Sequence, residues 1–283
     1  MSANVSIPIA GFKDVYDVGD VEKALTELSP SANEALRTLY EKMVRLGGQR
    51  FTVKPSALPA MEGLFAELPN FTEVLEDIRK HLALCIDSND SVELPPMLLL
   101  GAPGIGKTHF ARKVAEMLGT GFGFVPMSSL TAGWVLSGAS SQWKNAKPGK
   151  VFDTFVNGDY ANPVIVVDEI DKASADGQYD PLGALYELLE TETATRFVDE
   201  FVELPIDASG AVWLATANDA GRIPEPLLSR LAVYEIDAPD AEGAARIART
   251  IYGEIRSAHD WGRQFPETLS PSVLEKLAAL PPR

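Results

Sequence analysis

The chain has 283 residues, of which 46% are hydrophobic and 23% are charged, and its formal net charge at pH 7 is −15. This length and composition are those of a globular protein with one large domain or two modest ones. The negative charge argues against general binding of DNA or RNA, because contacts to phosphates dominate that affinity. A single cysteine, Cys85, excludes an internal disulfide and a cysteine-rich zinc site.

No apolar run approaches the ~20 residues that a bilayer-spanning helix needs. The N-terminus, Met1 to Val5, lacks the basic stretch and the apolar segment of a secretory signal. We therefore expect a cytoplasmic protein without a membrane partner.

Residues 1–90 are expected to form a mainly helical accessory region. The residues Ser31-Ala32-Asn33-Glu34 match a capping box, and the apolar residues that follow have helical spacing up to a Gly-Gly pair. A short strand is expected at 50–53. A second amphipathic helix is expected after Asn70, and it places Cys85 on its apolar face as a core residue.

The segment 101–108 reads GAPGIGKT, the complete phosphate-binding pattern G-x-x-x-x-G-K-[ST]. Glycines let backbone N–H groups face phosphate oxygens, Lys107 can reach the β- and γ-phosphates, and the Thr108 hydroxyl can coordinate Mg²⁺. An apolar strand precedes this loop and an amphipathic helix follows it, as an anion site at a helix N-terminus requires. The candidate nucleotide-binding residues are Gly101, Ala102, Pro103, Gly104, Ile105, Gly106, Lys107, Thr108 and the adjoining His109.

From residue 97 onward, apolar strands alternate with helical segments, which predicts an α/β fold with a parallel sheet covered by helices on both faces. The expected strands are 97–100, 124–127, 164–167, 211–216 and 233–236. After Pro239 the pattern is helical only, with one helix capped by Asp240 and ending near 255, and another from 270 to 280. The predicted organisation is an N-terminal region at 1–90, an α/β core at 91–239 and a partial helical lid at 240–283.

Two acids, Asp168 and Glu169, end the apolar strand at 164–167. A charged pair at the carboxyl end of a buried strand is costly unless it serves a ligand. Asp168 is placed to hold Mg²⁺, directly or through water, and Glu169 to orient and activate a water against the γ-phosphate. Taken alone, the pair is equally consistent with an ordinary polar turn, but its combination with the phosphate loop favours a nucleotide site.

Two later polar residues are candidates for the same site. Asn218 ends the next apolar strand and could hold the attacking water from the opposite side. Arg230 lies one segment further on, where it fits a residue that reaches the γ-phosphate of a neighbouring subunit and stabilises transition-state charge. Its spacing alone favours the alternative, a surface ion pair.

Together these segments resemble an AAA+ ATPase, and within that superfamily they are most similar to the ATPase part of Lon proteases. The resemblance rests on GAPGIGKT at 101–108, VVDEIDK at 166–172, the stretch 185–219 and IPEPLLSR at 223–230, in that order, and it covers about 97–240. It implies a P-loop NTPase of five parallel strands with a helical lid, and ATP with Mg²⁺ as ligands. It implies catalytic roles for Lys107, Glu169, Asn218 and Arg230, and Mg²⁺ ligation by Thr108 and Asp168.

The resemblance also implies a ring-like homo-oligomer, usually a hexamer, with each nucleotide between two subunits. Family members carry a nucleotide-sensing arginine in the lid, for which Arg283 is the candidate here. In Lon proteases a Ser–Lys peptidase domain follows the lid, so we expect no peptidase activity from residues 1–283.

The loop 140–150 contains an unusual combination of Trp143 with lysines at 144, 147 and 150. In the Lon family, the corresponding segment carries an aromatic residue followed by an aliphatic one, which grip a polypeptide in the central pore. Trp143 takes the aromatic position, but Lys144 replaces the aliphatic residue. The loop could pack against a peptide or stack on a nucleic-acid base; a buried tryptophan that anchors the loop is the alternative.

The main hypothesis is an ATPase that couples Mg-ATP turnover between subunits to remodelling or unfolding of a protein substrate. The alternative is an assembly or scaffold switch whose oligomeric state is set by ATP binding. Remodelling of nucleic acid is disfavoured by the acidic charge.

Overall fold

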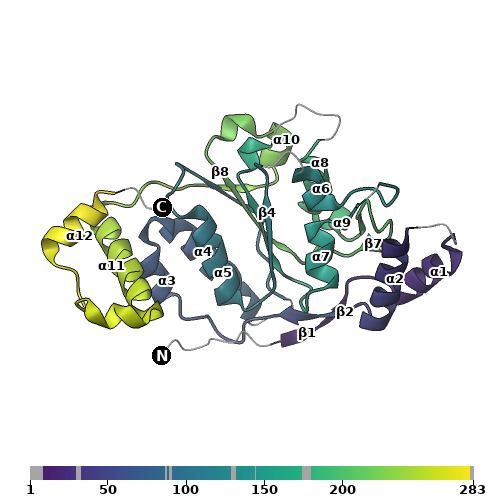
Figure 1. Ribbon diagram of the computed structural model, residues 1–283, viewed down its shortest axis with the longest axis horizontal. Helices are drawn as coiled ribbons and strands as arrows, with labels where there is room; N and C mark the ends of the chain where they lie inside the picture. Colours follow the sequence, from purple (N-terminus) through teal and green to yellow (C-terminus); the bar gives the residue numbers. More distant parts are fainter. Residues whose placement is uncertain are drawn as a thin grey trace.

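A five-stranded parallel sheet lies at the centre of the computed structural model, which describes residues 9–29, 33–86, 88, 91–128, 132–143, 145–173 and 180–280 (Figure 1). The strand order is β4-β5-β8-β3-β9. Their bounds are β3 Met97–Leu100, β4 Phe122–Pro126, β5 Val164–Asp168, β8 Val212–Ala217 and β9 Ala232–Glu235. The predicted α/β fold with five parallel strands is confirmed. The second strand begins at Phe122, two residues earlier than expected.

Side chains of the central strands enter two apolar clusters on opposite faces of the sheet, because successive side chains of a strand point in opposite directions. On β5, Ile165 and Val167 belong to one cluster, whereas Val164 and Val166 belong to the other. A strand buried on both faces needs apolar residues at every position. This explains the unbroken apolar runs in the sequence.

Helices cover both faces of the sheet. One face carries α3 Glu62–Glu67, the short turn η1 Pro69–Phe71, α4 Thr72–Ile86 and α5 Lys107–Leu118. Cys85 of α4 is buried in this layer, as predicted. The opposite face carries α6 Ala132–Ser137, α7 Lys150–Val156 and α8 Gly183–Leu188, and α9 Thr191–Ala194 contacts α8.

Several short elements connect the strands of the sheet with the helices of the two layers. They are η2 Ile170–Lys172, the two-stranded pair β6 Phe197–Val198 and β7 Pro205–Ile206, η3 Ala220–Arg222 and α10 Glu225–Leu228. Two of them, η2 and η3, directly follow β5 and β8, so they begin at the edge of the sheet where the phosphate loop lies.

The N-terminal residues form two helices at one end of the molecule and a strand pair that runs from them toward its middle (Figure 1). Their bounds are β1 Ile9–Asp14, α1 Val18–Glu27, α2 Glu34–Leu46 and β2 Gln49–Val53, and β1 pairs with β2 in antiparallel fashion. The strand expected at 50–53 is confirmed, whereas β1 and α1 were not predicted. The expected cap at Ser31 is wrong, because α2 begins after Asn33, whose side chain accepts the N–H of Ala35 at 2.9 Å.

This N-terminal unit is anchored to the core by a buried arginine. The Arg50 guanidinium on β2 donates to the carbonyl oxygens of Phe155 and Val156 at 3.0 and 2.5 Å. These carbonyls belong to the last turn of α7, where they lack helical partners. Tyr40 and Met43 of α2 enter the same apolar cluster as α7. Residues 9–53 therefore share a core with the α/β sheet.

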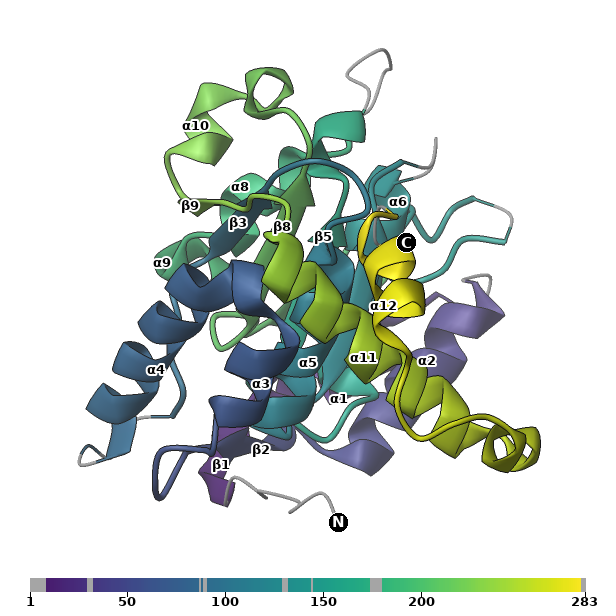
Figure 2. The ribbon, with the colours of Figure 1, turned by 90° about the vertical axis from the view of Figure 1, so that its left-hand side faces the viewer.

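The C-terminal residues, which the sequence predicts as a helical lid, form α11 Ala241–Ala258, η4 Asp260–Gln264 and α12 Pro271–Ala278. Asp240 caps α11 as expected, accepting the N–H of Gly243 at 2.7 Å. The lid lies at the opposite end from α1 and α2, and Figure 2 shows α11 beside α3. Within the described residues, no helix is both long enough and apolar enough to cross a membrane.

Candidate nucleotide site

The loop between β3 and α5 has the backbone geometry that phosphate binding requires. Gly104 and Gly106 have φ angles of +81° and +100°, in the left-handed region that favours glycine. Gly101 has no space for a side chain, since a Cβ there would lie 2.3 Å from the Ile236 carbonyl oxygen. The loop ends at Lys107, the first residue of α5, so the free N–H groups of that helix face the loop.

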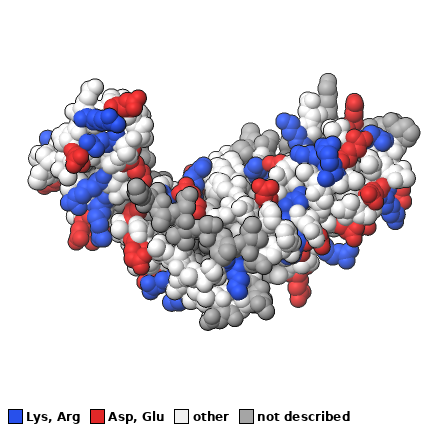
Figure 3. Space-filling view, turned by 90° about the horizontal axis from the view of Figure 1, so that it is seen from below, with Lys and Arg blue, Asp and Glu red and all other residues white. Residues whose placement is uncertain are grey.

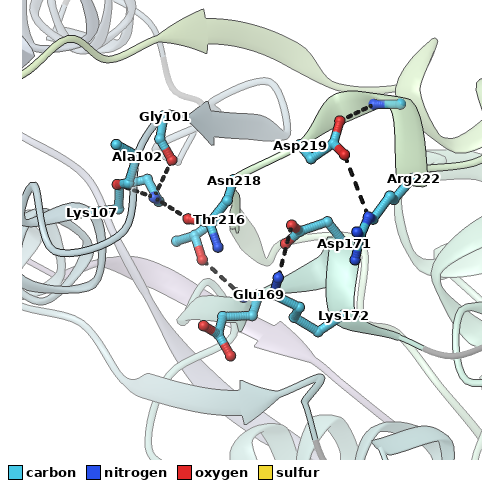
Figure 4. Close-up of polar contacts among 11 residues, drawn as sticks. Gly101, Ala102, Lys107, Glu169, Asp171, Lys172, Thr216, Asn218, Asp219 and Arg222 are labelled. Carbon is cyan, nitrogen blue, oxygen red and sulfur yellow. Dashed lines mark hydrogen bonds and ion pairs between the residues drawn. The ribbon is translucent and has the colours of Figure 1, made fainter.

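Lys107 connects this loop to the end of β8. Its Nζ donates to the carbonyl oxygens of Gly101 and Ala102 at 2.7 and 2.9 Å, and to Oδ1 of Asn218 at 2.9 Å (Figure 4). The lysine is only 8% exposed. Burial lowers the pKa of Lys107, while the nearby carboxylates of Asp171, Asp168 and Glu169 act in the opposite direction. The fold thus brings together a lysine and an asparagine that lie 111 residues apart.

Thr108 and Asp168 form a pair of oxygen ligands beside the loop. The Thr108 hydroxyl donates to Oδ1 of Asp168 at 2.8 Å. Mg²⁺ prefers oxygen ligands and is usually held by one or two protein groups together with phosphates and waters. The pair fits that preference. In the part of the chain that the structure describes, no cluster of three or more His, Cys, Asp or Glu residues is arranged for a metal ion.

Glu169 follows Asp168 in a conformation that is unusual for a residue with a side chain, with φ 55° and ψ 49°. Its backbone N–H donates to the Thr216 hydroxyl at 2.9 Å, and that hydroxyl donates to Oδ1 of Asp168 at 2.8 Å. Sequence reasoning missed Thr216. The available signal was a hydroxyl group in an otherwise apolar strand, two residues before Asn218.

Asp171 is a second residue that sequence reasoning did not single out. Its side chain is fully buried in η2, and neither carboxylate oxygen has a hydrogen-bond partner among the described residues. The Nζ of Lys172 lies 3.8 Å from it (Figure 4). A buried carboxylate is costly unless positive charge compensates it, and Asp171 is the carboxylate that most raises the pKa of Lys107. Figure 4 shows Asp171 on the far side of Asn218 from the phosphate loop.

The site geometry agrees with similarity to known proteins. Residues 97–236 match the family described as ATPase family associated with various cellular activities (AAA). The chain is 32% identical over 205 residues to Lon protease 2 of Herpetosiphon aurantiacus, in an alignment that covers 72% of this chain and 25% of that protein. It is 38% identical over 157 residues to the Lon protease of Metamycoplasma arthritidis, in an alignment that covers 56% of this chain and 19% of that protein. This chain carries a Lon-like AAA+ ATPase module.

The chain spans about a quarter or less of the length of these two relatives. Among solved structures, the AAA+ module is similar in fold to the closed state of Hsp104 with ATPγS and FITC casein. The TM-score is 0.57 at 17% identity, and the match covers 83% of this chain and 41% of that one. A complex of Saccharomyces cerevisiae Hsp104 with casein in an extended conformation gives a TM-score of 0.55 at 17% identity, with the same coverage.

Arg230 of the AAA+ module lies after α10 and contacts its own chain. Its Nε and Nη2 lie 2.6 and 2.5 Å from Oε1 of Glu190, and its guanidinium lies over the Tyr186 ring at 5.6 Å. These contacts place Arg230 with α8 and α9 rather than with the phosphate loop. Within a single chain, Arg230 therefore forms the ion pair that its spacing favoured.

His109, another predicted site residue, lies at the margin of this geometry. His109 is half exposed on α5, and its Nε2 lies 3.0 Å from Oε1 of Glu67 on α3. It therefore faces the lid side of the module. Lys144 and Arg283 lie outside the described residues.

Trp143 lies on the surface beside a second tryptophan. It is 41% exposed, and its ring packs edge-on against Trp134 of α6, with centroids 5.2 Å apart. Trp134 is 37% exposed. The alternative of a buried Trp143 is therefore wrong, and the two indole rings together present aromatic surface next to the loop.

A buried carboxylate fixes the base of the Trp143 loop. Asp199 accepts the backbone N–H groups of Gly149, Phe201 and Val202 at 2.6, 2.9 and 3.2 Å. Burial nevertheless raises the pKa of Asp199 to about 6, because loss of hydration outweighs these bonds. Gly138, on the other side of the loop, has no space for a Cβ, which would lie 2.5 Å from Oδ1 of Asp199.

Proposed function

We propose that this module hydrolyses ATP with Mg²⁺ and that turnover at contacts between subunits remodels or unfolds a protein substrate. The observation that carries the proposal is that five residues meet at the carboxyl edge of the sheet, next to the N-terminus of α5, four through their side chains and Glu169 through its backbone N–H. They are Lys107, Thr108, Asp168, Glu169 and Asn218. The membership of the core in the AAA family supports ATP as the nucleotide.

Each of these residues has a role that its chemistry supports. The backbone of loop 101–106 and the Lys107 ammonium bind the phosphates, and Thr108 with Asp168 holds Mg²⁺. When bound, Mg²⁺ neutralises charge that develops on the phosphate oxygens. Glu169 orients and activates the attacking water, and Asn218 holds that water from the opposite side.

We infer that the working form is a ring-like homo-oligomer, with six subunits as the expected number. Arg230 would act on the nucleotide of a neighbouring subunit, where a guanidinium stabilises charge in the transition state. The position of Arg230 away from its own phosphate loop supports this assignment.

The substrate is proposed to be a polypeptide that contacts Trp143, with Lys144 beside it in the sequence. The exposed pair of Trp143 and Trp134 supports this, because aromatic rings bury large apolar areas against a chain. Nucleic acid fits less well. The net charge is −15, and Figure 3 shows acidic and basic side chains interspersed at both ends of one face. We assign no peptide-bond cleavage to residues 1–283.

The ATPase rate per subunit, measured with Mg²⁺ over a wide range of protein concentration, tests the proposal. We expect a rate that rises with concentration, because a neighbour completes each site. Lys107→Ala should lose ATP binding, whereas Glu169→Gln should bind ATP and not hydrolyse it. A near-zero rate at all concentrations, despite tight ATP binding, would instead favour a switch whose assembly is set by nucleotide.

A further inference from the structure

Thr216 links the two acidic residues at the end of β5 from a different strand. It is 1% exposed on β8, which pairs with β5 in parallel. Its Oγ1 lies 2.8 Å from Oδ1 of Asp168 and 2.9 Å from the backbone nitrogen of Glu169. One hydroxyl therefore contacts the carboxylate of Asp168, which we assign to Mg²⁺, and the backbone of Glu169, whose carboxylate we assign to the attacking water.

The direction of both hydrogen bonds follows from the groups involved. A backbone N–H can only donate, so the Thr216 oxygen accepts the bond from Glu169. The hydroxyl hydrogen is then left to donate to Asp168. Oδ1 of Asp168 also accepts the hydroxyl hydrogen of Thr108, at 2.8 Å. Two donors on one oxygen fix the orientation of that carboxylate.

The bond to Glu169 holds a strained backbone. A left-handed conformation is disfavoured for residues with a Cβ, and it persists only where the surroundings hold it. The Thr216 hydroxyl provides such a restraint directly at the N–H of Glu169. Without the hydroxyl, this N–H would lose its partner, and the backbone could relax toward an extended conformation. The Glu169 side chain would then point in a different direction.

We propose that Thr216 is a positioning residue that sets the orientation of the Asp168 and Glu169 carboxylates for ATP hydrolysis. The inference rests on the function proposed above. Thr216 acts through these two acids, so its loss should slow the chemical step and leave binding of the nucleotide at the Lys107 loop largely intact.

The test compares Thr216→Val with Thr216→Ser in the full chain. Valine keeps the branched shape of threonine and removes the hydroxyl, whereas serine keeps the hydroxyl. We expect T216V to lower kcat by roughly 10- to 100-fold, as misplaced catalytic groups do, with KM for ATP changed by no more than about twofold. T216S should recover most of the wild-type kcat. Thr154→Val is the matched control, because it removes a hydroxyl whose partner among the described residues is the Lys150 carbonyl on α7.

The outcomes separate this inference from the proposed function. Wild-type protein with no ATPase activity above that of Lys107→Ala would overturn both. Active wild-type protein together with a wild-type kcat in T216V would overturn the role of Thr216 alone, and so would a T216S variant as slow as T216V. Thermal unfolding checks the fold of each variant. If T216V does not fold, Thr216→Ala is compared with T216S by the same criterion.

Discussion

Arg230 is bonded to Glu190 of the same chain, with its Nε and Nη2 at 2.6 and 2.5 Å from one carboxylate oxygen. Both side chains are partly exposed, and ion pairs of this kind contribute only about 0–1 kcal/mol. The pair therefore holds the arginine in a defined position without binding it strongly. Such an arrangement suits the proposed role of Arg230, in which its guanidinium leaves Glu190 for the nucleotide phosphates of a neighbouring subunit.

Substitution of Arg230 by alanine should abolish the part of the ATPase rate that depends on assembly. Arginines supplied to a neighbouring phosphate contribute roughly 10³–10⁵ to kcat. We expect Arg230→Ala to reduce kcat by about 1,000-fold or more on that basis, while ATP binding to each subunit is retained. Steady-state rates with ATP-binding titrations measure both quantities. A full rate in this variant would show that Arg230 is only a surface ion-pair residue.

Removal of the charge on Glu190 should have the opposite effect. If Glu190 competes with a neighbour's phosphates for Arg230, Glu190→Gln should raise the rate at limiting protein concentration by about two- to fivefold, the equivalent of a weak ion pair. Glu192→Gln is a suitable control, because Glu192 is exposed on the adjacent helix and forms no ion pair with Arg230 among the described residues. A lower rate in E190Q would mean that Glu190 positions the arginine.

The sheet and the phosphate loop could be predicted because local sequence dictates both. Continuous apolar runs are required where a strand is buried on both faces, and the glycines at 104 and 106 are required by their positive φ angles. By contrast, β1 reads IAGFKD, with a glycine and two charges, and has no apolar period. Its pairing with β2 comes from a contact distant in the sequence, which a reading of neighbouring residues does not capture.

The candidate site also combines residues that local sequence identifies with one that only the fold reveals. Lys107, Thr108, Asp168 and Asn218 could be selected because each occupies a fixed place in a motif, and the fold brings them into contact. Thr216 could not, because a β-branched residue in a strand is explained by strand preference alone. The role proposed for Thr216 depends on the groups that its hydroxyl contacts on and after the adjacent strand.

Asp199 should make the stability of the protein fall as pH rises. Burial raises its pKa from the ordinary 3.8 to about 6, so the folded state binds a proton more tightly than the unfolded chain does. The stability from this group is therefore fully present below pH 3.8 and is lost as pH rises through 6. This group contributes about 3 kcal/mol at most to the free energy of unfolding. About 1 kcal/mol of that contribution is lost between pH 5 and 7.

Asp199→Asn removes this titration while keeping an acceptor oxygen for Gly149. We expect the difference in unfolding free energy between wild type and D199N to shift in favour of D199N as pH rises from 5 to 7. Urea unfolding at several pH values measures it. A difference that stays constant would mean that the three backbone N–H bonds keep Asp199 ionised throughout this range.

Trp143→Ala should separate contact with the substrate from ATP hydrolysis. The edge-on contact with Trp134 at 5.2 Å is worth about 0.5–1.5 kcal/mol, so the variant should fold with a modest loss of stability. We expect basal ATPase activity within about twofold of wild type, because the Trp143 ring packs on Trp134 and its backbone bonds to Ser140 and Ala146, which lie outside the proposed nucleotide site.

Stimulation of the ATPase by casein, used as an unfolded-protein probe, should be lost in Trp143→Ala and largely kept in Trp143→Phe, which retains an aromatic ring. Gln142→Ala, an exposed neighbour, serves as the matched control. Casein stimulation that is unchanged in W143A would remove Trp143 from the substrate contact. Equal losses of stability and basal ATPase rate in W143A and Trp134→Ala would instead mean that the two rings support the loop structure. In that role each ring only packs against the other, so the loss of either one has the same effect.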